Sequence, residues 1–166
     1  MAKTKQVLKH EIQKFLEPKM VLVRHILVPF DDSDYSRTAF DFGLDLAKKY
    51  GAKISVISVM YSSAIGSSFL DINPHQTSME KTRIARLSKE FGLFKVLADK
   101  HKVEFNADVV MSSSVADTIL AFASSQKAEL IVMGTRGRNG GPRHLRLGSV
   151  AIDVSQRSNV PVLLVK

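Results

Sequence analysis

A stretch rich in glycine and arginine, residues 134–149, has the residue types and spacing of a phosphate-binding loop. It begins with GTRGRNGG at Gly134 and ends with Gly148 and Ser149. Glycine lets the backbone approach a ligand closely and turn its N–H groups toward an anion, and a helix that begins at Gly148 adds free N–H groups of its own. Tight turns alone would also account for these glycines, so that simpler interpretation stays open.

Arginines accompany these glycines in a segment that contains no acidic residue. They are Arg136, Arg138, Arg143 and Arg146. A guanidinium group forms paired hydrogen bonds with phosphate oxygens, so these arginines suit a phosphorylated ligand. A solvated basic loop is the alternative. The whole chain has 24 Lys and Arg against 16 Asp and Glu, a formal charge of +8 that favours anionic partners.

Other residue types that carry chemistry give weaker signals. Asp31 and Asp32 are adjacent at the end of a predicted strand, where neighbouring side chains point in different directions, so we expect a loop acid and a helix cap rather than a catalytic pair. No serine belongs to a visible Ser, His and Asp arrangement, and we predict no catalytic residue. The five histidines lack metal-ligand spacing, so we predict no metal site, and the absence of cysteine excludes thiol catalysis and thiolate metal sites.

Short segments rich in valine and isoleucine alternate with helical patterns along the chain. Several of these segments are apolar almost throughout, as expected for parallel strands covered on both faces. The predicted strands are 25–30, 53–60, 103–111, 129–134 and 160–166. The predicted helices are 39–50, with a cap at Ser33 or Asp34 and an end at Gly51, then 84–101, 116–123 and about 148–157.

This order of elements predicts an α/β fold: an open five-stranded parallel sheet with helices on both faces, forming a three-layer sandwich. Ligands of such sheets bind beyond the carboxyl ends of the strands, where the strand order reverses. Asp31 follows the first predicted strand and the glycine-rich stretch follows the fourth. We therefore expect a ligand cleft between the first and fourth strands.

Two segments lie outside the alternating pattern. Residues 1–23 are predicted to be an N-terminal extension with a short amphipathic helix over 4–17, which either docks across a dimer or forms a disordered tail. Residues 61–77, rich in Ser, Gly, Asn and Pro, are predicted to be a mobile loop. No apolar run approaches the roughly 20 residues of a membrane-spanning helix and no secretion signal is visible, so we expect a cytoplasmic protein.

Several of these motifs together resemble the universal stress protein family. The first strand leads into Pro29, Asp31 and Ser33, and the fourth runs into GTRG, then GSVA, then a final VPVLLVK. Nucleotide-binding members of that family have G-x-x-G, nine residues, then G-[ST]. Gly134, Gly137, Gly148 and Ser149 match this pattern, with the ten residues 138–147 in place of nine. The resemblance covers residues 24–166 and implies an adenine nucleotide alpha-hydrolase-like fold.

The resemblance also implies a site for ATP or another adenine nucleotide, with or without Mg. Pro29 and Asp31 would meet adenine and ribose, Val59 would offer backbone contacts to adenine, and Met133 would cover the base. The ribose and phosphates would be surrounded by Gly134, Gly137, Gly148, Ser149 and Val150, with Arg136 and Arg138 neutralising phosphate charge.

The function expected on these grounds is that of a stress-response regulatory protein whose nucleotide occupancy alters an unknown protein target. One alternative is a slow ATP hydrolase or phosphotransferase that uses the same site. Another is a family member without nucleotide that acts through protein or nucleic-acid contacts. We do not expect membrane or nucleic-acid partners, since the chain has three Tyr and no Trp for base stacking. The resemblance further implies a homodimer through the final strand, 160–166.

Overall fold

Five short strands form one parallel sheet in the computed structural model, which describes residues 23–61, 74–138 and 147–166. The strands are β1 (His25–Pro29), β2 (Lys53–Tyr61), β3 (Phe105–Ser112), β4 (Leu130–Gly134) and β5 (Val162–Val165). Every pairing between neighbouring strands is parallel. The sheet predicted from the apolar segments is thus confirmed.

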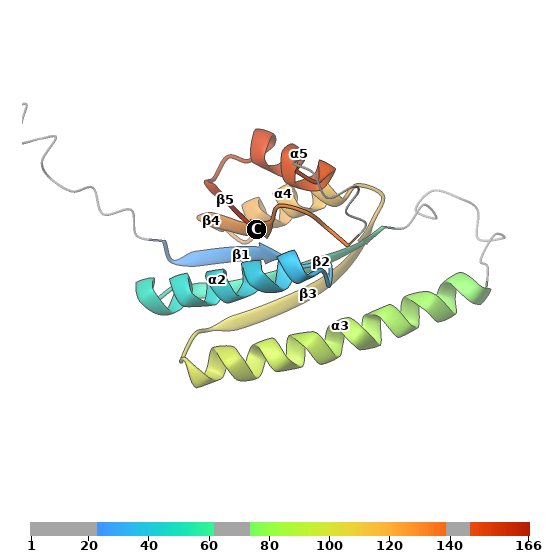
Figure 1. Cartoon of the computed structure of the whole chain (residues 1–166), viewed down its shortest axis with the longest axis horizontal. Helices are drawn as coiled ribbons and strands as arrows, with labels where there is room; N and C mark the ends of the chain where they lie inside the picture. Colours follow the sequence, from blue (N-terminus) through green and yellow to red (C-terminus); the bar gives the residue numbers. More distant parts are fainter. Residues whose placement is uncertain (1–22, 62–73, 139–146) are drawn as a thin grey trace, which may run out of the picture.

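Helices cover both faces of this sheet, which confirms the three-layer sandwich. They are α2 (Asp34–Tyr50), α3 (Pro74–Lys100), α4 (Val115–Ser125) and α5 (Ser149–Arg157). α2 and α3 lie on one side of the sheet and α4 and α5 on the other (Figure 1). Alternate residues of β1 serve the two layers, because Ile26 and Val28 pack with α2 and α3 while Leu27 packs with α4 and α5.

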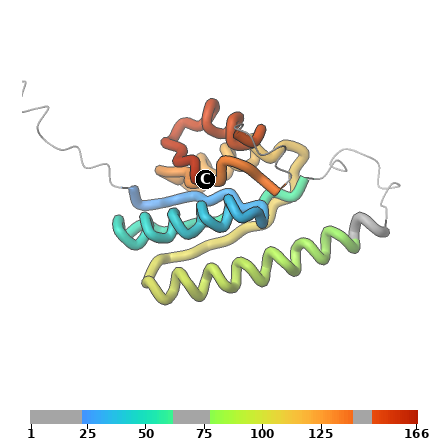
Figure 2. The backbone as a smooth tube through the Cα atoms, viewed as in Figure 1, coloured from blue at the N-terminus to red at the C-terminus, as the bar shows by residue number. Residues whose placement is uncertain are grey.

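An aromatic cluster joins α2 and α3 to the sheet. The rings of Phe40 and Phe94 are stacked with centroids 3.7 Å apart, and Phe30 meets the edge of Phe94 at 5.1 Å. Leu87 lies on α3 about two turns before Phe94 and is 1% exposed. These contacts bury one stripe of a helix that runs along the outside of this layer (Figure 2), and they set which way its other residues face.

The strand order is β3-β2-β1-β4-β5. The chain therefore proceeds outward from β1 to β2 and β3, then returns to place β4 on the other side of β1. This reversal separates the loops that follow β1 and β4 and opens a crevice at the carboxyl ends of these two strands. The strand arrangement behind the predicted cleft is thus confirmed.

Local signals fixed the ends of α2 as predicted. The hydroxyl of Ser33 accepts a hydrogen bond from the N–H of Ser36 at 3.1 Å, and the Ser36 hydroxyl accepts one from the N–H of Ser33, forming a capping box. At the other end Gly51 has φ +67°, a left-handed conformation that glycine adopts without steric cost.

The loop predicted over 61–77 is wrong at both ends. Tyr61 is the last residue of β2, and α3 begins at Pro74. Proline is favoured in the first turn of a helix, where its missing N–H leaves no hydrogen bond unmade, so the Pro that suggested a loop instead starts a helix. Residues 62–73 and the helix predicted over 4–17 lie outside the described residues. Within the described residues, no helix combines the length with the apolar composition needed to span a membrane.

His25 links three elements at the opposite end of the sheet from the predicted cleft. It is 3% exposed, and its Nδ1 donates to the carbonyl of Gln126 at 2.9 Å while its Nε2 lies 2.8 Å from the hydroxyl of Ser55. These partners suit the neutral imidazole. Burial lowers the pKa of His25 from the ordinary 6.5, although the hydrogen bond to Gln126 acts in the opposite direction.

This lowered pKa makes stability depend on pH. Below about pH 6.5 the unfolded chain binds a proton at His25 more readily than the folded chain does, so the free energy of unfolding should decrease as the pH falls from 7 to 5.5. His25→Gln should remove much of this dependence, whereas His101→Gln, at a half-exposed position, should keep it. Thermal unfolding followed by circular dichroism at several pH values tests this; equal slopes for the wild type and His25→Gln would contradict it.

Candidate functional site

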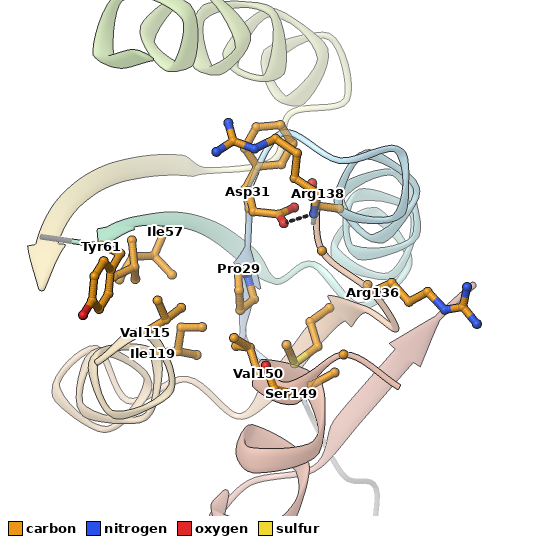
Figure 3. A pocket seen from close by; sticks show the side chains of 18 of the residues that line it. Pro29, Asp31, Ile57, Tyr61, Val115, Ile119, Arg136, Arg138, Ser149 and Val150 are labelled. Atoms are coloured by element: carbon orange, nitrogen blue, oxygen red, sulfur yellow. Dashed lines mark hydrogen bonds between the residues drawn. The ribbon is translucent and has the colours of Figure 1, made fainter. Parts of the chain in front are cut away.

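A cavity of about 820 Å³ lies at the carboxyl ends of β1 and β4 (Figure 3). Its lining comes from β1 and the loop after it, from β2, α2, α3 and α4, and from β4, the segment after it and α5. A volume of this size is within the range of pockets that bind small molecules and cofactors. The cleft therefore stands where the strand-order reversal predicts a ligand site.

All eleven residues that the sequence suggested for the site line this one cavity. They are Pro29, Asp31, Val59, Met133, Gly134, Arg136, Gly137, Arg138, Gly148, Ser149 and Val150. They come from four separate stretches of the chain, which the parallel sheet brings to one edge. The fold therefore places all of them around a shared cavity.

One side of the cleft is apolar. Ile57, Val115, Ile119 and Pro29 present hydrocarbon to the cavity, with Tyr61 standing beside Ile57 at the end of β2 (Figure 3). The tyrosine is 64% exposed. Such a wall suits a flat, weakly polar group, which gains free energy by leaving water.

Asp31 marks the polar side of the cleft. Its Oδ2 accepts a hydrogen bond from the backbone N–H of Arg138 at 2.7 Å (Figure 3), and its Oδ1 accepts from the Ser33 hydroxyl at 2.6 Å. These bonds hold the carboxylate in place and tie the loop after β1 to the segment after β4. A Cβ added at Gly137 would stand 2.6 Å from Oδ2, so only glycine permits this approach.

The first turn of α5 adds backbone N–H groups to the polar side. Gly148 is the N-cap residue, and no side chain caps the turn. Ser149, Val150 and Ala151 line the cavity, and the first N–H groups of a helix have no partner within it. Together with the helix dipole, these groups favour an anion at this end of the cleft.

Two backbone hydrogen bonds hold the segment after β4. The N–H of Thr135 donates to the carbonyl of Val165 at 2.8 Å, and the N–H of Gly148 donates to the carbonyl of Thr135 at 2.8 Å. β5, this segment and the start of α5 are therefore connected in series. Residues 139–146, which contain part of the predicted glycine- and arginine-rich stretch, lie outside the described residues.

Arg136 and Arg138, the two arginines predicted to bind phosphate, have side chains that point in different directions (Figure 3). The Arg138 side chain lies beside Asp31 on the side of the cleft where α3 passes, whereas Arg136 points away from the other labelled side chains (Figure 3). Both residues line the cavity. Arg138 is therefore the better placed of the two for a ligand inside the cleft.

Asp31 and Asp32 diverge, as expected for adjacent residues at a strand end. Asp32 has φ +70°, and its side chain is 5% exposed and turned toward the helices. It forms an ion pair with Arg37 of α2, and its Oδ2 lies 2.7 Å from Nε of Arg86 on α3. Asp32 therefore anchors helices, while Asp31 faces the cleft.

Nine further residues line the cavity that the sequence analysis did not single out: Phe30, Ser36, Ile57, Tyr61, Arg83, Val115, Ile119, Leu147 and Ala151. Strand position could have indicated both Tyr61, which ends β2, and Ile57, which pairs with Pro29 at the end of β1. No local signal indicates Arg83, since its place depends on how α3 packs. Across the described parts of the chain, no three His, Asp or Glu side chains gather in a way that would hold a metal ion.

Comparison with known proteins assigns residues 23–166 to a family model described as the universal stress protein family. A curated relative, universal stress protein MJ0531 of Methanocaldococcus jannaschii, is 35% identical over 150 residues, covering 87% of this chain and 83% of the relative. These matches span the whole of the described fold.

Solved structures share the fold at lower identity. Universal stress protein UspA from Lactobacillus plantarum has a TM-score of 0.77 and 22% identity, covering 87% of this chain and 98% of its own. A universal stress protein in complex with cAMP has a TM-score of 0.63 and 24% identity, and the match covers 87% of this chain and 98% of that protein's chain. The universal stress protein from Archaeoglobus fulgidus in complex with dAMP has a TM-score of 0.60 and 20% identity, and the match covers 89% of this chain and 100% of that protein's chain.

The close packing of Gly134 against α2 is testable. A Cβ at Gly134 would lie 2.7 Å from Cβ and 2.9 Å from the carbonyl carbon of Tyr35, and the backbone cannot easily yield. Gly134→Ala should therefore lower the free energy of unfolding by about 1–3 kcal/mol. The matched change Gly92→Ala, in α3 where a Cβ meets nothing within 4 Å, should raise it by about 1 kcal/mol. Urea denaturation compares the two, and an equal effect would contradict the packing argument.

Proposed function

The chain belongs to the universal stress protein family, and we propose that it binds ATP or a related adenine nucleotide in the cleft between β1 and β4. In this proposal the occupied and empty forms differ in their contact with a regulatory protein partner. One observation carries the proposal above all: apolar side chains and the backbone at the start of α5, which is suited to an anion, line one cavity of about 820 Å³.

Each end of the cleft suits one part of an adenine nucleotide. The wall of Pro29, Ile57, Val115 and Ile119 takes the base, with Val59 and Met133 completing its surroundings. Asp31 accepts from ribose hydroxyls. The N–H groups of Gly134 and Gly137 and those of Ser149 and Val150 in the first turn of α5 donate to phosphate oxygens. Gly148, whose own N–H donates to Thr135, lets the backbone lie close to the phosphates.

Two solved structures of the same fold support this class of ligand, since one is a complex with cAMP and another a complex with dAMP. Both contain adenine and a phosphate, the two groups that the ends of this cleft complement.

Hydrolysis of the nucleotide has no specific observation in its favour. Asp31 is the only carboxylate among the described lining residues, and this proposal places it at the ribose rather than at a phosphate. A general base must reach a water molecule beside the phosphate. We therefore propose binding and regulation as the function, rather than turnover.

We also propose a homodimer through β5. This strand lies at the edge of the sheet, where unpaired backbone groups favour pairing with another strand, and Leu163 on it is 38% exposed. Two copies that pair along β5 would cover the unpaired backbone groups of this strand and the exposed side chain of Leu163.

The nucleotide site is tested with Gly137→Val. Its side chain would displace the Asp31 carboxylate, so affinity for ATP should fall by about tenfold or more. Isothermal titration calorimetry with and without magnesium chloride measures this, and mass spectrometry of the purified protein identifies any retained nucleotide. Gly92→Ala is the control and should bind as the wild type does. Unchanged ATP affinity in Gly137→Val would contradict the site.

The dimer is tested with Leu163→Lys. A lysine at an apolar interface would have to lose its hydration, so the dimer should weaken by about tenfold or more. Light scattering at micromolar concentration measures the molecular mass. Leu93→Lys on α3, at a position that is also exposed, is the control and should leave the mass unchanged. A monomeric wild type, or a Leu163→Lys variant as dimeric as the wild type, would contradict the proposal.

A further inference from the structure

A second arginine faces the cleft from an element that the glycine motif does not include. Arg83 lies on α3, half-buried, and lines the same cavity as Arg138 from the segment after β4. The two residues are 55 positions apart in the chain, and only the packing of α3 brings their charges together.

The packing of α3 holds Arg83 at this position. Leu87, one turn further along the same helix face, is buried, and Arg86 pairs with Asp32 at 2.7 Å. Glu90, another turn along, forms an ion pair with Arg37 of α2. These contacts attach the helix to the loop after β1, so the backbone that carries Arg83 is fixed beside the cleft.

The nearby acids are already engaged. The oxygens of Asp31 accept hydrogen bonds from Ser33 and from the Arg138 backbone, and Asp32 is paired with Arg37 and Arg86. Among the residues that the structure describes, Arg83 forms no salt bridge. Partial burial, and then the positive charge of Arg138, lower the pKa of Arg83 from its ordinary value. The negative charges of Asp31 and Asp32 act on the pKa of Arg83 in the opposite direction, but neither carboxylate forms a salt bridge with it among the described residues. The guanidinium remains charged at neutral pH, so two like charges line one cavity.

We propose that Arg83 and Arg138 form an outer anion subsite that holds the terminal phosphate of a nucleoside di- or triphosphate. The inference rests on the proposed nucleotide site and adds a residue from α3 to it. The first phosphate is held by the N–H groups of the glycine-bearing segment and α5, and the chain of further phosphates leads out to the two arginines. Guanidinium groups bind phosphate oxygens through paired, charge-assisted hydrogen bonds.

This subsite gives the cleft a selectivity based on phosphate number. A nucleoside monophosphate or a cyclic monophosphate satisfies the inner donors and leaves Arg83 and Arg138 unneutralised. A di- or triphosphate satisfies both groups. The structure therefore assigns this chain a preference for ADP and ATP over AMP and cAMP.

The test is calorimetry on the full chain with ATP, ADP and AMP at constant ionic strength, in EDTA and in magnesium chloride. The wild type should bind ATP and ADP more tightly than AMP. Arg83→Gln should lower ATP affinity by about tenfold, as expected for one lost charge-assisted contact, while AMP affinity changes less than about twofold. Lys89→Gln removes the same charge from an exposed position on the same helix and should leave all three affinities unchanged.

A second variant, Arg138→Gln, tests the other half of the subsite and should show the same selective loss for ATP. Thermal unfolding of each variant reports whether the fold is retained. Equal ATP and AMP affinities in the wild type would overturn the subsite and leave the proposed function intact. So would variants that weaken ATP and AMP alike, or that leave ATP affinity unchanged. A wild type that binds no nucleotide would overturn the proposed function and the subsite together.

Discussion

The pairing of β1 with β4 is the constraint on which the rest of the molecule depends. It is short, with Ile26 opposite Leu130 and Leu27 opposite Ile131. Around it the N–H of Glu129 donates to the carbonyl of His25 at 2.9 Å, and the side chain of His25 reaches Gln126. β2 and β3 lie on the other side of β1, so the pairing of β1 with β4 reverses the strand order. This reversal separates the loop after β1 from the segment after β4 and opens the cleft.

A second level of order comes from contacts that cross the crevice. Asp31 and Arg138 are joined by a hydrogen bond between residues 107 positions apart, and the chain from Val165 through Thr135 to Gly148 is held by two more. Each such bond contributes only about 1 kcal/mol to stability. Their larger effect is geometric, since they aim backbone N–H groups at one cavity before a ligand arrives, and a site organised in advance binds with less loss of entropy.

The layer of α2 and α3 also takes part in the site, although the glycine motif contains none of its residues. The ion pairs of Asp32, Arg37, Arg86 and Glu90 join the loop after β1 to both helices, and the stacked rings of Phe40 and Phe94 join the helices to each other. A charge bound near Arg83 would therefore act on α3, a helix of 27 residues that runs along the outside of this layer (Figure 1).

The amino-acid sequence by itself determined the elements and most of the cleft. Apolar runs placed the five strands, Ser33 and Gly51 set the limits of α2, and the eleven proposed site residues all line one cavity. These features were predictable because strand burial, helix capping and glycine conformation act over a few neighbouring residues. Tertiary structure alone decided that Asp32 pairs with Arg86 of α3 and that Arg83 lines the same cavity as Arg138. Each of these depends on which surface of α3 packs against the sheet, and that is settled by contacts between residues far apart in the chain.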